Sequence, residues 1–447
     1  MWLLVLLLLA VVFIIVATTK FKLHPFLALL AAAFGYGILS REMSLEQVAD
    51  SVNAGFGGTI GYIGIVILAG AVIGTFLEKS GGAHQLAKST LKLVGKRNVP
   101  ATMGVIGYVV SIPVFCDSAF VILSPLARAL SRKVGISLAA SAVALSLGLY
   151  ATHTMVPPTP GPVAAAGLLE ADLGLVILWG VIVSIVALAT GWLFAITYAA
   201  SVDLPLDPQP SGDAPQEIAA CPPSAIKSIV PIFLPILLIV ARSIAQFPTQ
   251  PFGQGHAVAL INFVGQPVVA LLVGVCLAFL LPRKLTTEML SATGWVGQAV
   301  TTGAGIIIIT GCGGAFGRVL QDSGISQVVG DYLGGGANLS IWLPFLIAAA
   351  LKTAQGSSTV AIITTAGITA PLLGALGLEE PTARALAVVA IGAGSMVVSH
   401  ANDSYFWVVT GFSGMSVKQG YKLQTLGTLI QGTASAVTLW IISWIVL

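Results

Sequence analysis

The chain carries an internal repeat that covers almost its whole length. The segment Gly74–Gly81 reads GTFLEKSG, and the segment Gly317–Gly324, about 243 residues later, reads GRVLQDSG. Three further pairs of segments align at nearly the same spacing: 24–30 with 266–272, 117–121 with 357–361, and 146–153 with 393–400. One half of the chain therefore overlays the other almost without gaps, and both halves are expected to fold alike.

Composition identifies the solvent around these two halves. Of the 447 residues, 56% are hydrophobic and only 8% are charged, and the mean hydropathy is +0.98. A soluble domain carries about 25% charged residues. Because so little polar material cannot cover a water-facing surface, lipid is expected to surround most of the exterior. In a membrane chain, such a repeat is typical of a secondary transporter whose binding site lies between the halves.

The remaining composition argues against several other classes. The net charge of +3 is small and spread out, so the sequence shows no nucleic-acid patch. The four cysteines are scattered without a C-x-x-C pair, which indicates neither a disulfide framework nor a metal site. Residues 1–19 are apolar but have no basic segment before them and no good cleavage site after them, which indicates a retained first span.

Apolar stretches predict an all-α polytopic membrane protein with about ten spans, since one span needs about 20 apolar residues. The stretches are 1–19, 24–40, 54–77, 135–169, 173–199, 226–246, 256–281, 295–320, 383–413 and 424–446. Two others, 99–131 and 340–374, are too long for one span and have a polar break in the middle, so re-entrant hairpins are expected there. The spans 135–169 and 383–413 are also interrupted and are expected to be discontinuous helices.

Charge and proline content divide the chain into three regions. Residues 1–200 form the first repeat, residues 226–447 form the second, and the proline-rich segment 201–225 is expected to be a cytoplasmic linker. Most of the 20 Lys and Arg residues fall on the cytoplasmic side if both hairpins are re-entrant and the N-terminus is outside. The two hairpins then enter from opposite faces, so the repeats are inverted and both termini are expected on the outer, periplasmic side.

Four segments break the apolar pattern at membrane depth: 115–118, 153–162, 355–359 and 399–404. Helix N-termini carry partial positive charge and bind anions, and hydroxyls and amides add hydrogen-bond donors. Breaks that meet near the midplane are therefore expected to form the substrate site. The candidate binding residues are Ser118, His153, Thr154, Thr159, Gly161, Gln355, Ser357, Ser358, Thr359, His400 and Asn402. The competing interpretations are a kinked span or plain loop at 153–162 and a helix contact at 355–359.

Proton coupling is expected to involve carboxylates and histidines in the same breaks. Asp117 is the first candidate, because a buried carboxylate is costly unless it is paired, protonated or functional, and the second half has Ser357 at the matching place. Asp403 and the equivalent pair His153 and His400 are the other candidates. Both aspartates have an alternative interpretation as helix caps.

Lys352 lies inside the second hairpin, and the sequence leaves three alternatives open for it. It could neutralise an anion, pair with a carboxylate or extend to the interface. The two histidines and two aspartates show no ligand spacing on one face, so they do not indicate a metal site.

Several motifs carry a resemblance to a known family. The matching segments are 24–30, 54–59, 80–83, 152–153, 156–158, 160–162, 313–316, 319–320, 322–324, 356–357, 359–361, 399–400 and 402–403. Over its full length the chain resembles the gluconate permease family, proton symporters for gluconate and related acids, which belongs to a larger group of ion and carboxylate transporters. The resemblance implies a dimeric scaffold that holds two mobile transport domains working as elevators.

The chain departs from the gluconate members around the expected pocket. It has Cys116-Asp117 where an aromatic residue and Glu are expected, Thr159 where His is expected, Thr154 in place of a glycine, and Ser404-Tyr405 in place of Pro-Gly. The resembled family also includes carriers of other sugar acids, D-serine and short hydroxy acids. The resemblance therefore does not single out gluconate as the substrate.

These observations together predict a proton-coupled symporter of the inner membrane that takes up a small hydroxylated carboxylate, such as gluconate or a related sugar acid. The alternatives are a sodium-coupled carboxylate symporter, a carrier of D-serine or short hydroxy acids, and, from other classes, a channel or a membrane-embedded enzyme. The expected partners are an organic acid, the lipid bilayer and a second copy of the chain, with no nucleic acid. No cofactor is expected beyond the coupling ion, and no nucleophile–base pair or metal cluster indicates an enzyme.

Overall fold

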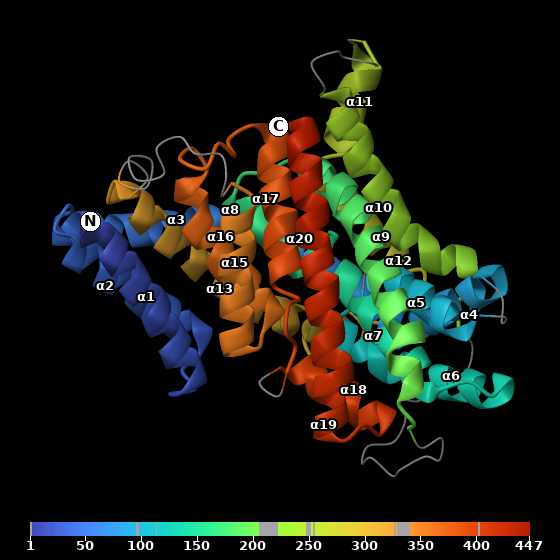
Figure 1. Ribbon diagram of the computed structural model, residues 1–447. Coiled ribbons are helices and arrows are strands. Elements are labelled where there is room, and N and C mark those ends of the chain that lie inside the picture. The colour runs from blue at the N-terminus through green and yellow to red at the C-terminus, as the bar shows by residue number, and fades with distance from the viewer. Residues whose placement is uncertain are drawn as a thin grey trace.

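The computed structural model describes residues 2–94, 98–112, 114–204, 222–246, 252–253, 255–325, 328, 340–400 and 403–447. Every element that these residues form is a helix (Figure 1). The all-α class predicted from the sequence is therefore confirmed. Most of the expected linker, residues 205–221, lies outside the described residues.

The helices follow the division of the sequence into two halves. Those of the first half are α1 (Trp2–Thr19), α2 (Pro25–Ser40), α3 (Leu45–Lys79), α4 (Gly82–Val94), α5 (Val99–Val110), α6 (Cys116–Val134), α7 (Leu138–Met155), α8 (Pro160–Leu168), α9 (Leu173–Thr197) and the 3-10 turn η1 (Ala199–Ser201). Those of the second half are α10 (Ala225–Ala245), α11 (His256–Val264), α12 (Pro267–Ala278), α13 (Trp295–Asp322), α15 (Trp342–Gln355), α16 (Ser358–Thr369), the 3-10 turn η3 (Ala370–Leu372), α17 (Pro381–Gly394), α18 (Ser404–Ser413), α19 (Val417–Gly420), the π-helical turn η4 (Tyr421–Thr425) and α20 (Leu426–Val446).

Length and composition identify candidate spans among the described residues. Five helical segments are long and apolar enough to cross a membrane: 138–168, 173–201, 225–245, 295–322 and 417–446. Counting two bent helix pairs, 45–79 and 256–278, as one span each raises the number to 7. Several other expected spans, such as α1 and α2, are shorter apolar helices. Both begin and end within one residue of the stretches marked from the sequence, 1–19 and 24–40.

Large apolar side chains face outward over much of the surface. Leu8 on α1 is 67% exposed, and Trp444 and Ile445 on α20 are 75% and 78% exposed. Exposing such side chains to water would cost about 25 cal/mol for each Å² of apolar surface. The exterior therefore suits lipid as its solvent, in agreement with the composition.

The two halves meet along α3 and α13, the helices that contain the repeated GTFLEKSG and GRVLQDSG segments. Gly55, near the start of α3, packs against Gly314 near the end of α13, whereas Leu68 of α3 packs against Gly303 nearer the start of α13. The two helices therefore run in opposite directions. A Cβ on Gly55 would lie 2.5 Å from the Gly314 carbonyl oxygen, so this approach requires glycine.

The packing around these two helices is visible in Figure 1. Helices α1 and α2 form a pair at the left edge of the view, and α20 runs at the front beside α9 and α17. Both chain ends lie in the upper half of the view.

Four interruptions separate pairs of consecutive helices. We call them break 1 (111–115, between α5 and α6), break 2 (156–159, between α7 and α8), break 3 (356–357, between α15 and α16) and break 4 (395–403, between α17 and α18). They fall where the sequence has its polar or proline-rich segments. In break 2, Pro157 and Pro158 cannot supply backbone donors and so cannot continue a helix.

Side chains of η4 and α20 bond the backbone of Ser399 in break 4. Thr425 Oγ1 donates a hydrogen bond to the carbonyl oxygen of Ser399 at 2.5 Å, and the Ser399 N–H donates to Thr428 Oγ1 at 3.0 Å. Non-helical backbone is tolerated at membrane depth only where protein or a wet cavity receives it. These contacts hold Ser399 against η4 and α20.

Candidate functional site

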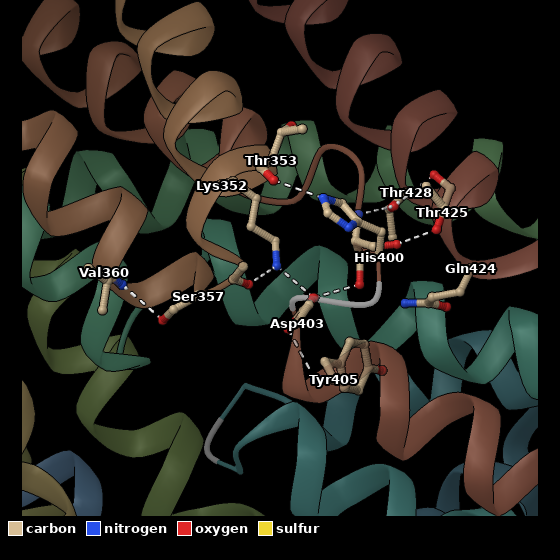
Figure 2. Close-up of polar contacts among 12 residues, drawn as sticks. Lys352, Thr353, Ser357, Val360, His400, Asp403, Tyr405, Gln424, Thr425 and Thr428 are labelled. Carbon is tan, nitrogen blue, oxygen red and sulfur yellow. Dashed lines mark hydrogen bonds and ion pairs between the residues drawn. The ribbon is translucent and has the colours of Figure 1, made fainter. Parts of the chain in front are cut away.

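A buried ion pair joins break 3 to break 4 (Figure 2). Lys352, in the last turn of α15, places Nζ 2.6 Å from Oδ2 of Asp403, and the two side chains are 0% and 5% exposed. The same ammonium donates to the carbonyl oxygen of Gly356 and lies 5.8 Å from the centre of the Tyr150 ring. Of the alternatives that the sequence left open for Lys352, the structure shows pairing with a carboxylate.

Both carboxylate oxygens of Asp403 are occupied. Its Oδ2 also accepts a hydrogen bond from Ser399 Oγ at 2.5 Å, and its Oδ1 accepts the backbone N–H of Tyr405 at 3.1 Å. The second bond makes Asp403 the N-cap of α18. Asp403 therefore caps α18, as its alternative interpretation held, and it also pairs with Lys352, as the burial of a charge requires.

Asp117 lies in the first turn of α6 and has a different environment. Phe115 is the N-cap of that helix and has no side-chain capping bond within the described chain. The Oδ1 atom of Asp117 is buried and has no hydrogen-bond partner among the described residues. The charges of Asp403 and Lys352 both act on this carboxylate, so the three groups form one electrostatic cluster. A buried oxygen without a partner is costly, which makes Asp117 a natural position for a proton or a ligand.

His153, in the last turn of α7, is a second group with an unpartnered atom. Its Nδ1 is buried and lacks a hydrogen-bond partner within the described part of the chain, and the side chain is only 7% exposed. Its ring lies 6.0 Å from the ring of Phe115 in break 1. The charges of Asp403 and Lys352 act on His153 as well, so it belongs to the same cluster.

His400 has different surroundings, although the repeat places it opposite His153 in the alignment. Its Nε2 lies 2.8 Å from the carbonyl oxygen of Thr353, and its ring stacks on Tyr421 at 6.4 Å. Figure 2 shows the ring turned toward Thr353. His400 therefore links break 4 to α15 and η4, and the sequence equivalence of the two histidines does not extend to their contacts.

Three predicted binding residues have packing or hydrogen-bonding roles around break 2. Thr154 Oγ1 donates to the Tyr150 carbonyl oxygen at 3.1 Å, and Thr159 Oγ1 donates to the Val156 carbonyl oxygen at 2.7 Å. Both threonines are buried. Gly161, at the start of α8, lies so close to Ile362 that an added Cβ would be 2.8 Å from its Cδ1. These contacts hold α7 and α8 in place beside the cluster.

The predicted hydroxyls of break 3 gather at the start of α16. Ser357 is exposed and caps the helix, because its Oγ accepts the backbone N–H of Val360 at 3.3 Å. Ser358 and Thr359 follow in the first turn and are half-buried.

The remaining predicted residues divide between the first half and the undescribed positions. Ser118 is half-buried in the first turn of α6. The side chain of Gln355 and the whole of Asn402 lie outside the described residues.

A cavity of about 330 Å³ reaches break 1. Its lining includes Asp117 and Ser118 on α6, Thr75 and Lys79 on α3, and Gln298 and Thr302 on α13. Lys79, Gln298 and Thr302 are exposed, so the cavity opens at the end of the molecule where α3 ends and α13 begins. It therefore connects the unpartnered carboxylate with the exterior.

A second cavity, of about 760 Å³, lies between α3, α13 and the ends of α8 and α16. Its lining includes Arg318, Arg384, Glu170 and Glu379, but the described residues that line it include none of the predicted binding residues. Volume alone therefore does not identify the candidate site.

Sequence reasoning missed the aromatic part of the cluster. The rings of Tyr150 and Tyr405 are 5.0 Å apart, and Tyr405 Oη donates to the Ser146 carbonyl oxygen at 3.0 Å. The Tyr150 side chain is fully buried. In the sequence, Tyr150 stands about one helical turn before His153, and this spacing puts both side chains on one face of α7. That spacing could have predicted that Tyr150 belongs to the cluster.

A structural metal ion usually needs three or more ligating side chains close together. Among the described residues, no group of three or more His, Cys, Asp or Glu side chains could hold a metal ion.

Two solved structures have the same fold as this chain. The chain is similar to the YdaH transporter of Alcanivorax borkumensis, with a TM-score of 0.62, 16% identity and 90% of each chain covered. It is also similar to MtrF of Neisseria gonorrhoeae, with a TM-score of 0.60, 14% identity, and 89% of this chain and 84% of that chain covered. At these identities the likeness shows the fold alone.

Sequence relatives then identify the family. A family model described as GntP family permease matches residues 2–445. The chain is 35% identical to a gluconate permease of Pseudomonas aeruginosa, with 98% of this chain and 96% of that protein covered. It is 30% identical to the D-serine transporter DsdX of Escherichia coli, with 100% and 99% covered. The chain therefore belongs to the GntP family of permeases, as its motifs indicated.

Family membership also decides the broad activity and location. The relatives are permeases and transporters, so this chain is a transporter of small organic acids and not an enzyme. Together with the apolar helices, membership makes it a multi-pass inner-membrane protein.

Proposed function

We propose that this permease takes up a small hydroxylated carboxylate together with a proton. The observation that carries the proposal is the asymmetry of the buried cluster: Lys352 and Asp403 neutralise each other, whereas Asp117 keeps an unpartnered oxygen. The cluster can therefore bind one proton without breaking an existing ion pair.

Asp117 is the proposed proton site. With Lys352 paired, an ionised Asp117 leaves the cluster with one net negative charge, and that charge repels an anionic substrate. Protonation of Asp117 removes the repulsion, so the proton and the carboxylate are expected to bind together. His153 is the second candidate, because its Nδ1 also lacks a partner among the described residues.

The substrate carboxylate is proposed to lie at the starts of α6 and α16. The first N–H groups of a helix are not satisfied within the helix, and they carry partial positive charge. Ser118, Ser358 and Thr359 lie in the first turns of these two helices and can bond the substrate hydroxyls. The cavity of about 330 Å³ beside Asp117 is large enough for a small ligand.

The antiparallel packing of α3 and α13 supports an inverted repeat. Equivalent helices related by a two-fold axis in the membrane plane must run in opposite directions. With the orientation expected from the charges, Lys79 and the cavity beside it face the cytoplasm, and both termini face the periplasm. A homodimeric scaffold with mobile transport domains is the corresponding architecture, and it is proposed from the family resemblance.

The proposal includes two classes of substrate, because one relative is named a gluconate permease and another a D-serine transporter. Sodium coupling is the alternative for the driving ion. Uptake of labelled gluconate, short hydroxy acids and D-serine into proteoliposomes separates these possibilities.

The expected result is accumulation in sodium-free buffer under an inward proton gradient, and loss of accumulation on adding a protonophore. Accumulation that requires a sodium gradient would establish the alternative. Passive equilibration without saturation would instead indicate a channel.

A further inference from the structure

We propose that Lys352 is a tethered cation: its ammonium group occupies a cation site that the fold builds between the C-terminal end of α15 and the N-cap of α18. The site follows from the contacts in the structure, and only its consequence for ion coupling rests on the proposed transport function. The ligand class that this site would take, once the ammonium is removed, is a small monovalent metal cation such as Na⁺ or Li⁺.

The site lies where one half-helix ends and another begins. Gly356 ends α15 with a φ of 88°, and its carbonyl oxygen accepts a hydrogen bond from the Lys352 ammonium. A helix C-terminus carries about half a negative charge, and Asp403 adds a full one. In sodium-coupled carriers, half-helix C-terminal ends and carbonyls of unwound backbone coordinate the ion. Here the same kind of position holds an ammonium that belongs to the chain.

The groups around Nζ suit a hard cation. A backbone carbonyl and a carboxylate are the oxygen ligands that hard cations prefer. Asp403 cannot turn away from the site, because Ser399 Oγ and the Tyr405 N–H hold its two oxygens. The Tyr150 ring, 5.8 Å from Nζ, supplies a third favourable partner. The lysine side chain is 0% exposed, so the ammonium depends on these partners in place of water.

The contacts of Lys352 do not favour a direct role in holding the substrate. A lysine that neutralises a bound anion must present its ammonium to the cavity, but Lys352 does not line the cavity that reaches Asp117. The repeat adds a second argument. Ile112 and Val156 stand in the first half at the places of Lys352 and Asp403, so that half has an apolar pair where the second half has the ion pair.

A tethered ammonium neutralises Asp403 and the end of α15 in every step of transport, but it cannot dissociate and be carried across the membrane. The coupling ion must therefore bind elsewhere in the cluster. The inference predicts that the natural protein is indifferent to sodium. It also predicts that shortening Lys352 opens an oxygen-lined vacancy for sodium or lithium.

Thermal unfolding of the purified full chain in detergent tests the inference. The unfolding midpoint is measured in sodium, lithium and choline chloride at equal ionic strength. The natural protein is expected to show no sodium-specific shift. For Lys352→Ala, sodium is expected to raise the midpoint in a saturable manner by at least about 2–4 °C relative to choline. The double variant Lys352→Ala/Asp403→Asn, which lacks the carboxylate ligand and the unbalanced charge, is expected to lose this response.

Three outcomes would overturn the inference: a saturable sodium shift in the natural protein, no sodium-specific shift in Lys352→Ala, or an equal shift in the double variant. Should Lys352→Ala unfold in choline, its recovery in sodium supports the inference, and failure to fold in either salt contradicts it. The measurement contains no substrate, so its failure leaves proton-coupled uptake standing. Loss of proton-coupled uptake in proteoliposomes would equally leave the cation site standing.

Discussion

Break 1 and break 3 occupy matching places in the repeat, yet they hold their polar groups in opposite ways. At break 3, the Lys352 ammonium has a carbonyl, a carboxylate and a ring as partners, and Ser357 caps α16. Just after break 1, Asp117 Oδ1 has no partner among the described residues, and neither has Nδ1 of His153, whose ring lies 6.0 Å from that of Phe115. A satisfied network is rigid, whereas an unsatisfied buried group gains most from a ligand or proton. A duplicated position can therefore keep its backbone break while its charged group takes a different role.

The largest effect is expected for Asp403→Ala, which removes one partner of the buried ion pair with Lys352. Removing one partner of a buried ion pair leaves an uncompensated charge and costs about 3–5 kcal/mol, so the thermal unfolding midpoint is expected to fall sharply. The matched control is Lys352→Met/Asp403→Leu, which removes both charges and should recover most of the loss. A single variant as stable as the double variant would show that the pair is not satisfied as described.

The next largest loss of stability is expected from disturbing the contact between the two halves. Gly55→Val places a side chain against the Gly314 backbone, and such overpacking costs about 1–3 kcal/mol. Gly57→Val is the matched control, because a Cβ at Gly57 meets nothing within 4 Å. Thermal unfolding of the two variants side by side measures the difference. Equal stability would mean that α3 and α13 do not approach as closely as this arrangement requires.

Asp117→Asn tests the carboxylate whose Oδ1 has no partner among the described residues. For one proton carried with a monoanion, the accumulation ratio is expected to reach about tenfold per pH unit of gradient, since 1.4 kcal/mol corresponds to a factor of ten. The asparagine variant cannot take up the proton, so its ratio should fall to one while exchange of labelled for unlabelled substrate continues. Asp117→Glu is the control that should keep some accumulation. Uphill uptake by the asparagine variant at full pH dependence would remove the assignment.

The smallest expected effect distinguishes the two helix starts. Ser357→Ala removes the side-chain cap of α16 and is expected to cost about 1 kcal/mol of stability. Ser118→Ala, in the first turn of α6, removes no cap seen in the structure, so a change within about 0.5 kcal/mol is expected. Thermal unfolding of both variants provides the comparison. A larger loss for Ser118→Ala would reverse the proposed difference between the breaks.

Sequence reasoning located the helix breaks well, because prolines and polar residues act on the backbone locally. The start of α8 at Pro160 and the start of α18 at Ser404 both fall within segments marked from the sequence. The same reasoning was weaker for some spans: it marked 54–77 where α3 covers Leu45–Lys79, and it marked 256–281 as one span where α11 and α12 are bent by 68°. It was weakest for side-chain partners. Thr154 and Thr159 read as free hydroxyls in the sequence, but each donates to a nearby carbonyl.

The sequence by itself determined the lipid environment, the helical class, the repeat and the family, because composition and local pattern carry all four. Only the tertiary structure decided which buried charges are satisfied. Lys352 and Asp403 are 51 residues apart and come together because the fold brings the last turn of α15 to the N-cap of α18. Asp117 is left without such a partner in the described chain. The reason is physical: burial makes a charge costly, but the cost depends on groups that distant segments bring within hydrogen-bonding distance.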